Sequence, residues 1–392
     1  MSRLCPLNTT VKHYAQMLVL CLLVYGCVEP FEATTQLFEK IMVIDATITD
    51  EVKNQEIHLS STFQFEEFVR APEEGAAIKV VDGSMVEYPF QEVLPGKYVS
   101  TFAFGAQPGV SYQLLITTTD GRNYTSDPTM APPSDPFFDL KATKTFNDVG
   151  EEGMSINVVY PPNNETKYYR YEYEEMYKII APKWTDVTLQ WINEFETIQV
   201  PKDPPGGRVC YKSDESNTII FNSTKSSDLE ESLEYPIRFI NNNDYFTLLH
   251  RYGIWVKQFA ITRATHTYLE TLKDFSGQDN ILSQTQPGFF SGNVYSEDYP
   301  DEKVLGYFDV TSVTTKSLFF NYRDFYPNEP LPRFIDACAE TSPDPALLRK
   351  LLDDGTVMFY LTDGFQNHFV VNRVCGDCTV LGQSEVPEFW ID

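Results

Sequence analysis

The sequence is poor in the residues from which most catalytic sites are built. The histidines that follow the first 26 residues are His58, His250, His266 and His368, and none lies in a metal-binding pattern such as His-Glu-x-x-His. There is no Gly-x-Ser-x-Gly elbow and no glycine loop that could hold a phosphate. Carboxylates are so abundant that no pair of them can be singled out as the acid and base of a hydrolase. We therefore predict a protein that is not an enzyme and has neither cofactor nor metal.

Positive charge is also scarce. The chain has 30 Lys and Arg residues against 56 Asp and Glu residues, which gives a formal net charge of −26. Such a chain would have to overcome repulsion by the phosphates of a nucleic acid, so we exclude nucleic acid as a partner. The charge favours solubility and would suit a cation or a basic partner, although a solvated acidic surface is the simpler explanation.

Long apolar runs are limited to one short segment near the N-terminus. Residues 17–24 read Met-Leu-Val-Leu-Cys-Leu-Leu-Val, and the preceding residues include Arg3 and Lys12 but no acid. The run is far shorter than the roughly 20 residues that a transmembrane helix needs. These features predict a cleavable signal peptide over residues 1–26.

The residues around the predicted cleavage site indicate a lipid anchor. The sequence Val24-Tyr25-Gly26-Cys27 fits a lipobox, in which a small residue precedes the cysteine that receives the lipid. The alternative is an ordinary signal peptide followed by a chance cysteine, and Tyr25 is an unusual occupant of its position. Several acyl chains would anchor firmly, because each buried CH₂ contributes roughly 0.8 kcal/mol. We predict lipidation at Cys27 and an acidic tether over residues 27–38, which loosely matches a signal for display at the cell surface.

The residues after the tether have the composition and turn spacing of a β protein. The chain contains 23 Tyr, 28 Phe, 25 Pro and 20 Gly, which suits many short strands joined by turns. Turn pairs such as Asp82-Gly83 and Asp120-Gly121 alternate with apolar strand segments. Regular spacing of this kind predicts an immunoglobulin-like β-sandwich over residues 39–130.

A second β-sandwich domain with a C-terminal extension is expected over residues 137–392, because prolines between residues 128 and 136 make a stiff connection. The predicted fold is thus mainly β: two immunoglobulin- or fibronectin-like sandwiches in tandem, a short crossover helix and an irregular, cysteine-containing C-terminal segment. Helical spacing places the crossover helix over Thr265–Phe275. A shorter helix is expected from Ala346 to Leu352, directly after a proline.

Three tyrosines in the second domain alternate with charged residues. Tyr169, Tyr171 and Tyr173 lie two positions apart, so a strand would place all three on one face of its sheet. Such a face could be an aromatic platform for sugars, but a face that packs in the core is the better interpretation.

Four cysteines remain if Cys27 carries lipid. They are Cys210, Cys338, Cys375 and Cys378, and outside the cytoplasm an even number predicts two disulfides with three pairings open. The alternative is a zinc site formed by the four thiolates, for which a single Cys-x-x-Cys pair is weak support. A thioredoxin-like role is disfavoured, because that motif should sit at the start of a helix in a βαβ unit, whereas here it follows the β segment of residues 369–372.

Several short motifs resemble one family. They are the lipobox, the Gly-Lys-Tyr turn at residues 96–98, the Pro-Gly-x-x-Tyr-x-Leu turn at residues 108–114, Gly292-Asn293-Val294-Tyr295, Leu305-Gly306-Tyr307-Phe308, and the stretch from Cys375-Gly376-Asp377-Cys378 to Pro387-Glu388-Phe389-Trp390. Together they look like the Bacteroidota envelope lipoproteins that are grouped as a domain of unknown function and often encoded beside TonB-dependent receptors. The resemblance implies an outer-membrane lipoprotein that works with a TonB-dependent β-barrel, and it brings no catalytic residues with it.

Two functions from different classes remain open at this point. The first is a non-catalytic binding or accessory subunit of an outer-membrane complex, held by its lipid anchor. The alternative is an envelope polysaccharide hydrolase or glycan-binding protein, which the aromatic strands and the many acids would suit. A concave aromatic pocket with facing carboxylates would favour the second.

Overall fold

The computed structural model describes residues 41–62, 71–133, 138–161, 166–193, 196–224, 232–244, 246–276 and 291–391. The predicted signal peptide, Cys27 and the tether lie outside these ranges. The described chain is mainly β and contains several sheets, which confirms the predicted fold class at that level. Among the described helices, none is long and apolar enough to cross a membrane.

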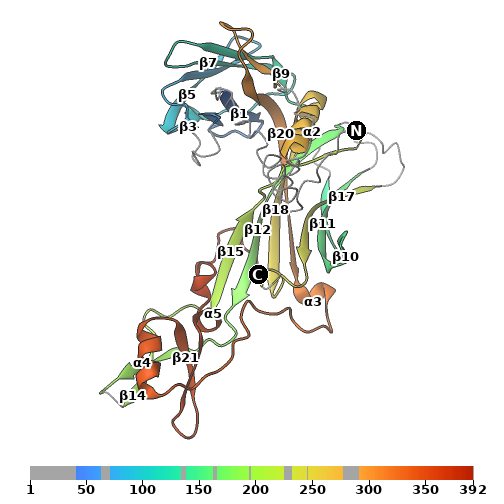
Figure 1. Cartoon of the computed structure of the whole chain (residues 1–392). Coiled ribbons are helices and arrows are strands. Elements are labelled where there is room, and N and C mark those ends of the chain that lie inside the picture. The colour runs from blue at the N-terminus through green and yellow to red at the C-terminus, as the bar shows by residue number, and fades with distance from the viewer. Residues whose placement is uncertain are drawn as a thin grey trace, which may run out of the picture.

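Strands from the N-terminal third form the first body, at the top of Figure 1. In β1, Ile44, Ala46 and Ile48 are at most 1% exposed, because alternate residues of a strand point to the same face and here that face meets the core. In hydrogen-bonded order the strands are β1 (Met42–Thr49), β2 (Glu56–Ser61), β6 (Lys97–Ser100), β5 (Glu87–Leu94), β4 (Ala77–Asp82), β7 (Ser111–Thr117) and β8 (Asn123–Ser126), with β3 (Ala71–Pro72) beside β2 and β9 (Thr129–Met130) beside β7.

Two strands from late in the chain complete this body. β19 (Val294–Ser296) pairs with β8, and the first half of β20 (Val304–Asn321) runs parallel to β1. Their buried residues, Val294 and Phe308 among them, belong to the first core. The sequence predicts these segments within a second domain over residues 137–392, but strand pairing puts them in the first. Alternation identifies a strand without saying which sheet it will join.

The second body consists of two sheets packed face to face. One contains β15 (Val209–Glu215) and β16 (Ile220–Ser223) beside β12 (Tyr168–Ile180), followed by β18 (Arg251–Ala260) and the second half of β20. The other contains β10 (Asp139–Phe146), β11 (Glu152–Tyr160) and β17 (Leu233–Asn241). Buried residues of both sheets share one core. Two tandem immunoglobulin-like domains are not confirmed, because one path of paired strands runs through both bodies.

One helix lies where the two bodies meet. α2 (Arg263–Ser276) includes the predicted Thr265–Phe275, and the side chain of Thr262 accepts a 3.0 Å hydrogen bond from the backbone N–H of Thr265 at its start. The rings of Tyr268 in the helix and Tyr307 in β20 are 4.9 Å apart. The helix therefore packs against the strand that links the bodies, as Figure 1 shows.

The C-terminal residues form a smaller lobe at the opposite end of the molecule from the first body (Figure 1). Leu189, Leu348, Phe359 and Val370 make its core. This distal lobe contains two hairpins, one formed by β13 (Val187–Trp191) and β14 (Thr197–Pro201) and the other by β21 (Val357–Thr362) and β22 (His368–Asn372). It also contains the helices α4 (Pro345–Asp353) and α5 (Arg373–Gly376) and the 3₁₀ helix η1 (Cys378–Val380). The short helix α3 (Tyr322–Phe325) directly follows β20 and precedes α4 in the chain. The predicted helix from Ala346 to Leu352 is present as α4, which Asp344 caps.

A single strand, β20, joins the two bodies. Its residues up to Thr311 pair with β1, and from Ser312 onward they pair with β18. With a rise of about 3.3 Å per residue, its 18 residues span on the order of 60 Å. Since each half is hydrogen-bonded to a different body, bending at the junction would disrupt the pairing on one side.

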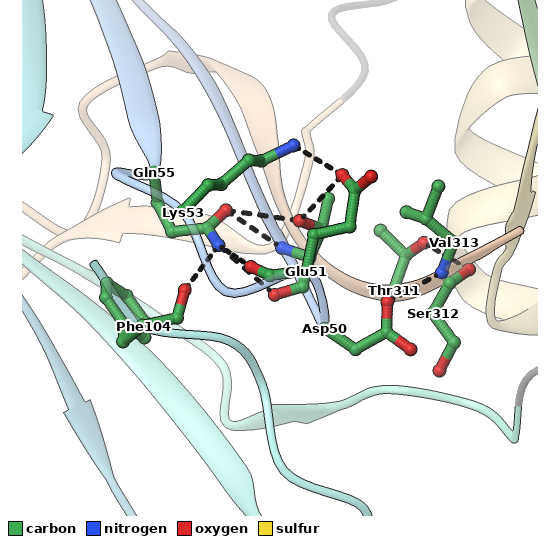
Figure 2. Close-up of polar contacts among 9 residues, drawn as sticks. Asp50, Glu51, Lys53, Gln55, Phe104, Thr311, Ser312 and Val313 are labelled. Atoms are coloured by element: carbon green, nitrogen blue, oxygen red, sulfur yellow. Dashed lines mark hydrogen bonds and ion pairs between the residues drawn. The ribbon is translucent and has the colours of Figure 1, made fainter. Parts of the chain in front are cut away.

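Polar contacts reinforce that junction, as Figure 2 shows. The Asp50 carboxylate, just after β1, accepts a 2.8 Å hydrogen bond from the backbone N–H of Val313 in β20. The completely buried side chain of Gln55 accepts from the N–H of Thr49 at 3.1 Å and donates to the carbonyl of Phe104 at 2.7 Å. Because both ends of this amide are satisfied, it fixes the turn after β1 next to β20.

Candidate functional site

The four cysteines predicted to form disulfides are joined in two pairs. Cys210 in β15 is bonded to Cys378 in η1, and Cys338 is bonded to Cys375 within the distal lobe. Asp336 lies beside the second pair, and the three side chains are the one group of potential metal ligands among the described residues. The zinc alternative needs four free thiolates, whereas the structure uses the sulfur atoms in disulfide bonds. Cys27 lies outside the described residues.

The four histidines lie in four different settings. His58 is an exposed strand residue near Glu56, and His266 packs against the rings of Tyr168 and Phe221. His250 and His368 are partly buried, and burial lowers the pKa of each. His368 lies between two threonine hydroxyls, 2.7 Å from Thr197 and 2.8 Å from Thr362, and so connects the two hairpins of the distal lobe. The contacts of His266 and His368 are structural.

The alternating tyrosines belong mainly to the core. Tyr169 and Tyr171 are at most 1% exposed, and the rings of Tyr169 and Tyr160 lie 5.1 Å apart between the two sheets. Tyr173 is partly buried against the same core. The core interpretation is therefore confirmed over the sugar platform for this face of β12.

The opposite face of β12 borders a cleft with a volume of about 430 Å³. Its floor is formed by the outward residues of β12 and β18, and Glu215 at the end of β15 lies at one side. Leu269 and Leu272 of α2, with Ile219 in the loop before β16, supply apolar walls. The cleft thus combines elements that are up to about a hundred residues apart in the sequence, and its size is ordinary for a small-ligand site.

The register of the strands aligns the cleft residues in rows. Glu174 is opposite Glu215 on one side and opposite Trp255 on the other. Two residues along the strand, Glu172 is opposite Lys257. Directly opposite residues in an antiparallel sheet have Cβ atoms roughly 5 Å apart and point to the same face. Two carboxylates and an indole therefore stand side by side.

The charges in the cleft are unequally paired. Arg170 is bound to Glu172, and its guanidinium lies 4.0 Å from the centre of the Phe259 ring. Glu174, Glu215 and Lys257 line the cleft without an ion pair or side-chain hydrogen bond to the part of the chain that is described. Like charges placed directly opposite each other destabilise a sheet. Glu174 and Glu215 are therefore a pair of neighbouring carboxylates, and neither has an ion-pair partner among the described residues.

Aromatic neighbours hold the indole of Trp255 in place. The ring of Phe319 in β20 lies 5.1 Å from it and that of Phe389 lies 4.6 Å from it, both edge to face. Trp390 packs beside them on Tyr211 with 5.0 Å between ring centres. The Phe389-Trp390 motif thus covers one end of the sheet face and positions Trp255 at the border of the cleft.

Two buried carboxylates outside the cleft have structural partners. Glu175 is 3% exposed, and its two oxygens accept bonds of 2.8 Å each from Arg238 in the facing sheet. Burial alone would lower the pKa of Arg238, but hydrogen bonds and attraction to Glu175 raise it above its usual value. Asp309 in β20 accepts a 2.9 Å hydrogen bond from the hydroxyl of Thr265 in α2. Burial raises the pKa of Asp309 to about 6.

The cleft residues were not singled out from the sequence. The signal that could have found them is the charged half of the alternation in β12, since residues Arg170, Glu172 and Glu174 must share the face opposite the tyrosines. The neighbours Trp255 and Glu215 depend on pairing between distant strands. That pairing carries no short-range signature.

Comparison with known proteins identifies a family whose model matches this chain. A family described as "Domain of unknown function (DUF4249)" matches residues 28–317, which is more than half of the 392 residues. The match spans the first body, the cleft strands β12 and β18, and most of β20. No curated protein and no solved structure matches the chain. On the extent of this match, the chain belongs to the DUF4249 family of unknown function.

Proposed function

We propose that the protein is a non-catalytic, lipid-anchored binding or accessory subunit of an outer-membrane complex, working with a TonB-dependent β-barrel. The observation that carries the proposal is that β20 places the entry of the chain and the distal lobe at opposite ends of the molecule. The chain enters the first body at Met42, opposite Val304, at the end of β20 that is remote from the second body. A lipid on Cys27 would hold this pole at the membrane and leave the distal lobe at the other pole (Figure 1).

The arrangement of polar groups supports binding over catalysis. Catalysis by a nucleophile needs a base within about 3 Å and a third group that orients the base. Within the described ranges, His266 and His368 are held in structural contacts and the cysteines are bonded in pairs. The cleft presents carboxylates and the indole of Trp255 side by side, which suits the binding of a ligand.

The second candidate is the glycan-binding or polysaccharide-hydrolase alternative, and the cleft with Trp255 favours its binding form. A hydrolase needs two carboxylates that face each other across the scissile bond. Glu174 and Glu215 are neighbours on one sheet face and point the same way, so a sugar would lie above both of them. The geometry therefore suits a glycan ligand better than glycan cleavage.

The anchor and the partner are tested together in cells. The full chain with a C-terminal tag is purified in mild detergent, and we expect a β-barrel protein to be recovered with it. Cys27→Ser should abolish incorporation of labelled fatty acid and release the protein from membranes, because the remaining chain has no lipid. Cys21→Ser, inside the predicted signal peptide, is the matched control and should keep the label. Recovery of the tagged chain alone from membranes would contradict the barrel partner.

A further inference from the structure

The cleft between β12, β18 and α2 has the three features that an organic cation requires. Glu174 and Glu215 supply two carboxylates without an ion-pair partner in the described structure, and Trp255 supplies the aromatic ring that attracts cations most strongly. Leu269 and Leu272 supply apolar surface for an alkyl chain. The net charge of −26 adds an attractive field for any cation that approaches.

We propose that this cleft binds a primary amine or guanidinium carried on an aliphatic stem, with the charge beside Glu174, Glu215 and Trp255 and the stem against α2. The same chemistry is present in a free polyamine and in a Lys or Arg side chain of a peptide. The proposal rests on the binding part of the proposed function and does not depend on the anchor or the barrel.

The other charged residues of the cleft determine its net charge and where the negative charge lies. Lys257 lies opposite Glu172 and adds a positive charge on the floor, but Glu172 is also bound by Arg170. Counting all five groups, three carboxylates face two cations. A bare metal ion is a poorer fit, since Glu174 and Glu215 do not belong to any group of three or more potential metal ligands among the described residues. The excess negative charge is concentrated at the Glu174–Glu215 pair.

The pair of like charges makes a second, independent prediction. In the free protein Glu174 and Glu215 repel each other, and a bound cation relieves that repulsion. Glu174→Gln should therefore raise the melting temperature of the free protein slightly while it weakens ligand binding. A carboxylate with only a structural role would not separate stability from binding in this way.

The test is calorimetric titration of the full chain with defined probes. The probes are spermidine, the peptide acetyl-Ala-Lys-Ala-amide, the same peptide with norleucine in place of lysine, and maltotriose as a neutral sugar. We expect at least one of the two cationic probes to bind with a dissociation constant below about 1 mM. Glu174→Gln, Glu215→Gln and Trp255→Leu should each weaken that binding by about tenfold. Glu385→Gln, an exposed acid outside the cleft, is the control for net charge and should leave binding unchanged.

The outcomes separate the two sources and the competing ligand. Tighter binding of spermidine than of the lysine peptide assigns the cleft to a free polyamine, and the reverse order assigns it to a side chain of a partner. Equal binding of the norleucine peptide, or binding of maltotriose that the two Gln variants do not alter, overturns the cation proposal. So does the absence of binding by both cationic probes. If no cation binds but a β-barrel protein is still recovered with the tagged chain, the proposed function is retained and only this inference is rejected.

Discussion

At the scale of single residues, Asp309 is a carboxyl group whose negative charge is disfavoured by its buried surroundings. It is 4% exposed at the junction between the bodies, and burial raises its pKa to about 6 from a usual 3.8. Hydrogen bonds from Thr265 and the backbone of Val310, with attraction to Arg170, oppose the shift without cancelling it. The folded protein therefore keeps a proton on Asp309 over a range of pH in which the unfolded chain has lost it.

This shift predicts how stability depends on pH. Between pH 3.8 and about 6 the folded state binds more protons at Asp309 than the unfolded state does, so stability falls as pH rises through this window and stays reduced above it. Asp309→Asn removes this dependence. We expect the variant to gain on the order of 2 kcal/mol relative to the parent at about pH 7, and to lose that advantage near about pH 4. Urea unfolding at several pH values measures the difference, and parallel pH curves for the two proteins would contradict it.

The alternation of residues in β12 shows which features of the fold could be predicted from the sequence and which could not. The alternation of Tyr169 and Tyr171 correctly predicted a face that packs in the core, because a two-residue period fixes which side chains share a face. The same period could not show that Glu174 would lie between Glu215 and Trp255. That arrangement depends on which strands pair, and in what register.

At the scale of elements, the close approach of β1, β20 and the residues just before β19 explains two motifs of the family resemblance. A Cβ atom on Gly292 would lie 1.6 Å from the carbonyl oxygen of Gly306, and one on Gly306 would lie 2.0 Å from that of Ile44. The side-chain amide of Asn293 then donates to the carbonyl of Phe308 and accepts from its N–H, both at 2.8 Å. Asn293 thus bonds to the edge of β20 as a neighbouring strand would.

Gly306→Ala should therefore damage the fold. The new methyl group meets the backbone of β1, which cannot move aside as a flexible side chain would, and φ is +127° at this position. We expect a loss of more than about 3 kcal/mol, or failure to fold. Gly364→Ala, where nothing lies within 4 Å of the added atom, is the control and should change stability by less than about 1 kcal/mol. Thermal unfolding monitored by circular dichroism compares the two variants. Equal melting temperatures would refute the claim that the close approach of β1 and β20 requires glycine at position 306.

At the scale of the whole molecule, the disulfide between Cys210 and Cys378 attaches the distal lobe to the second body. It links positions 168 residues apart, whereas Cys338 and Cys375 are 37 residues apart within the lobe. A cross-link restricts the unfolded chain more when it closes a longer loop. The first disulfide should therefore govern whether the lobe stays in place.

Removing each pair separately tests this division. Cys210→Ala with Cys378→Ala should cost about 3 kcal/mol and allow a protease to cut the irregular segment between α3 and α4. Cys338→Ala with Cys375→Ala should loosen the lobe while its attachment persists. Limited proteolysis with mass spectrometry of the fragments distinguishes the two. Identical fragment patterns from both double variants would show that the long-range disulfide has no special role.

The sequence by itself determined the local features of this protein. Periods of two and of nearly four residues, together with turn residues and caps, gave the strands, α2 and α4, and composition gave the acidic charge. The tertiary structure decided that β19 and β20 return to the first body, which cysteines pair, and that two carboxylates and an indole share one cleft. These are contacts between distant segments. They arise from the sum of many weak interactions in the folded chain, so no short stretch of sequence encodes them.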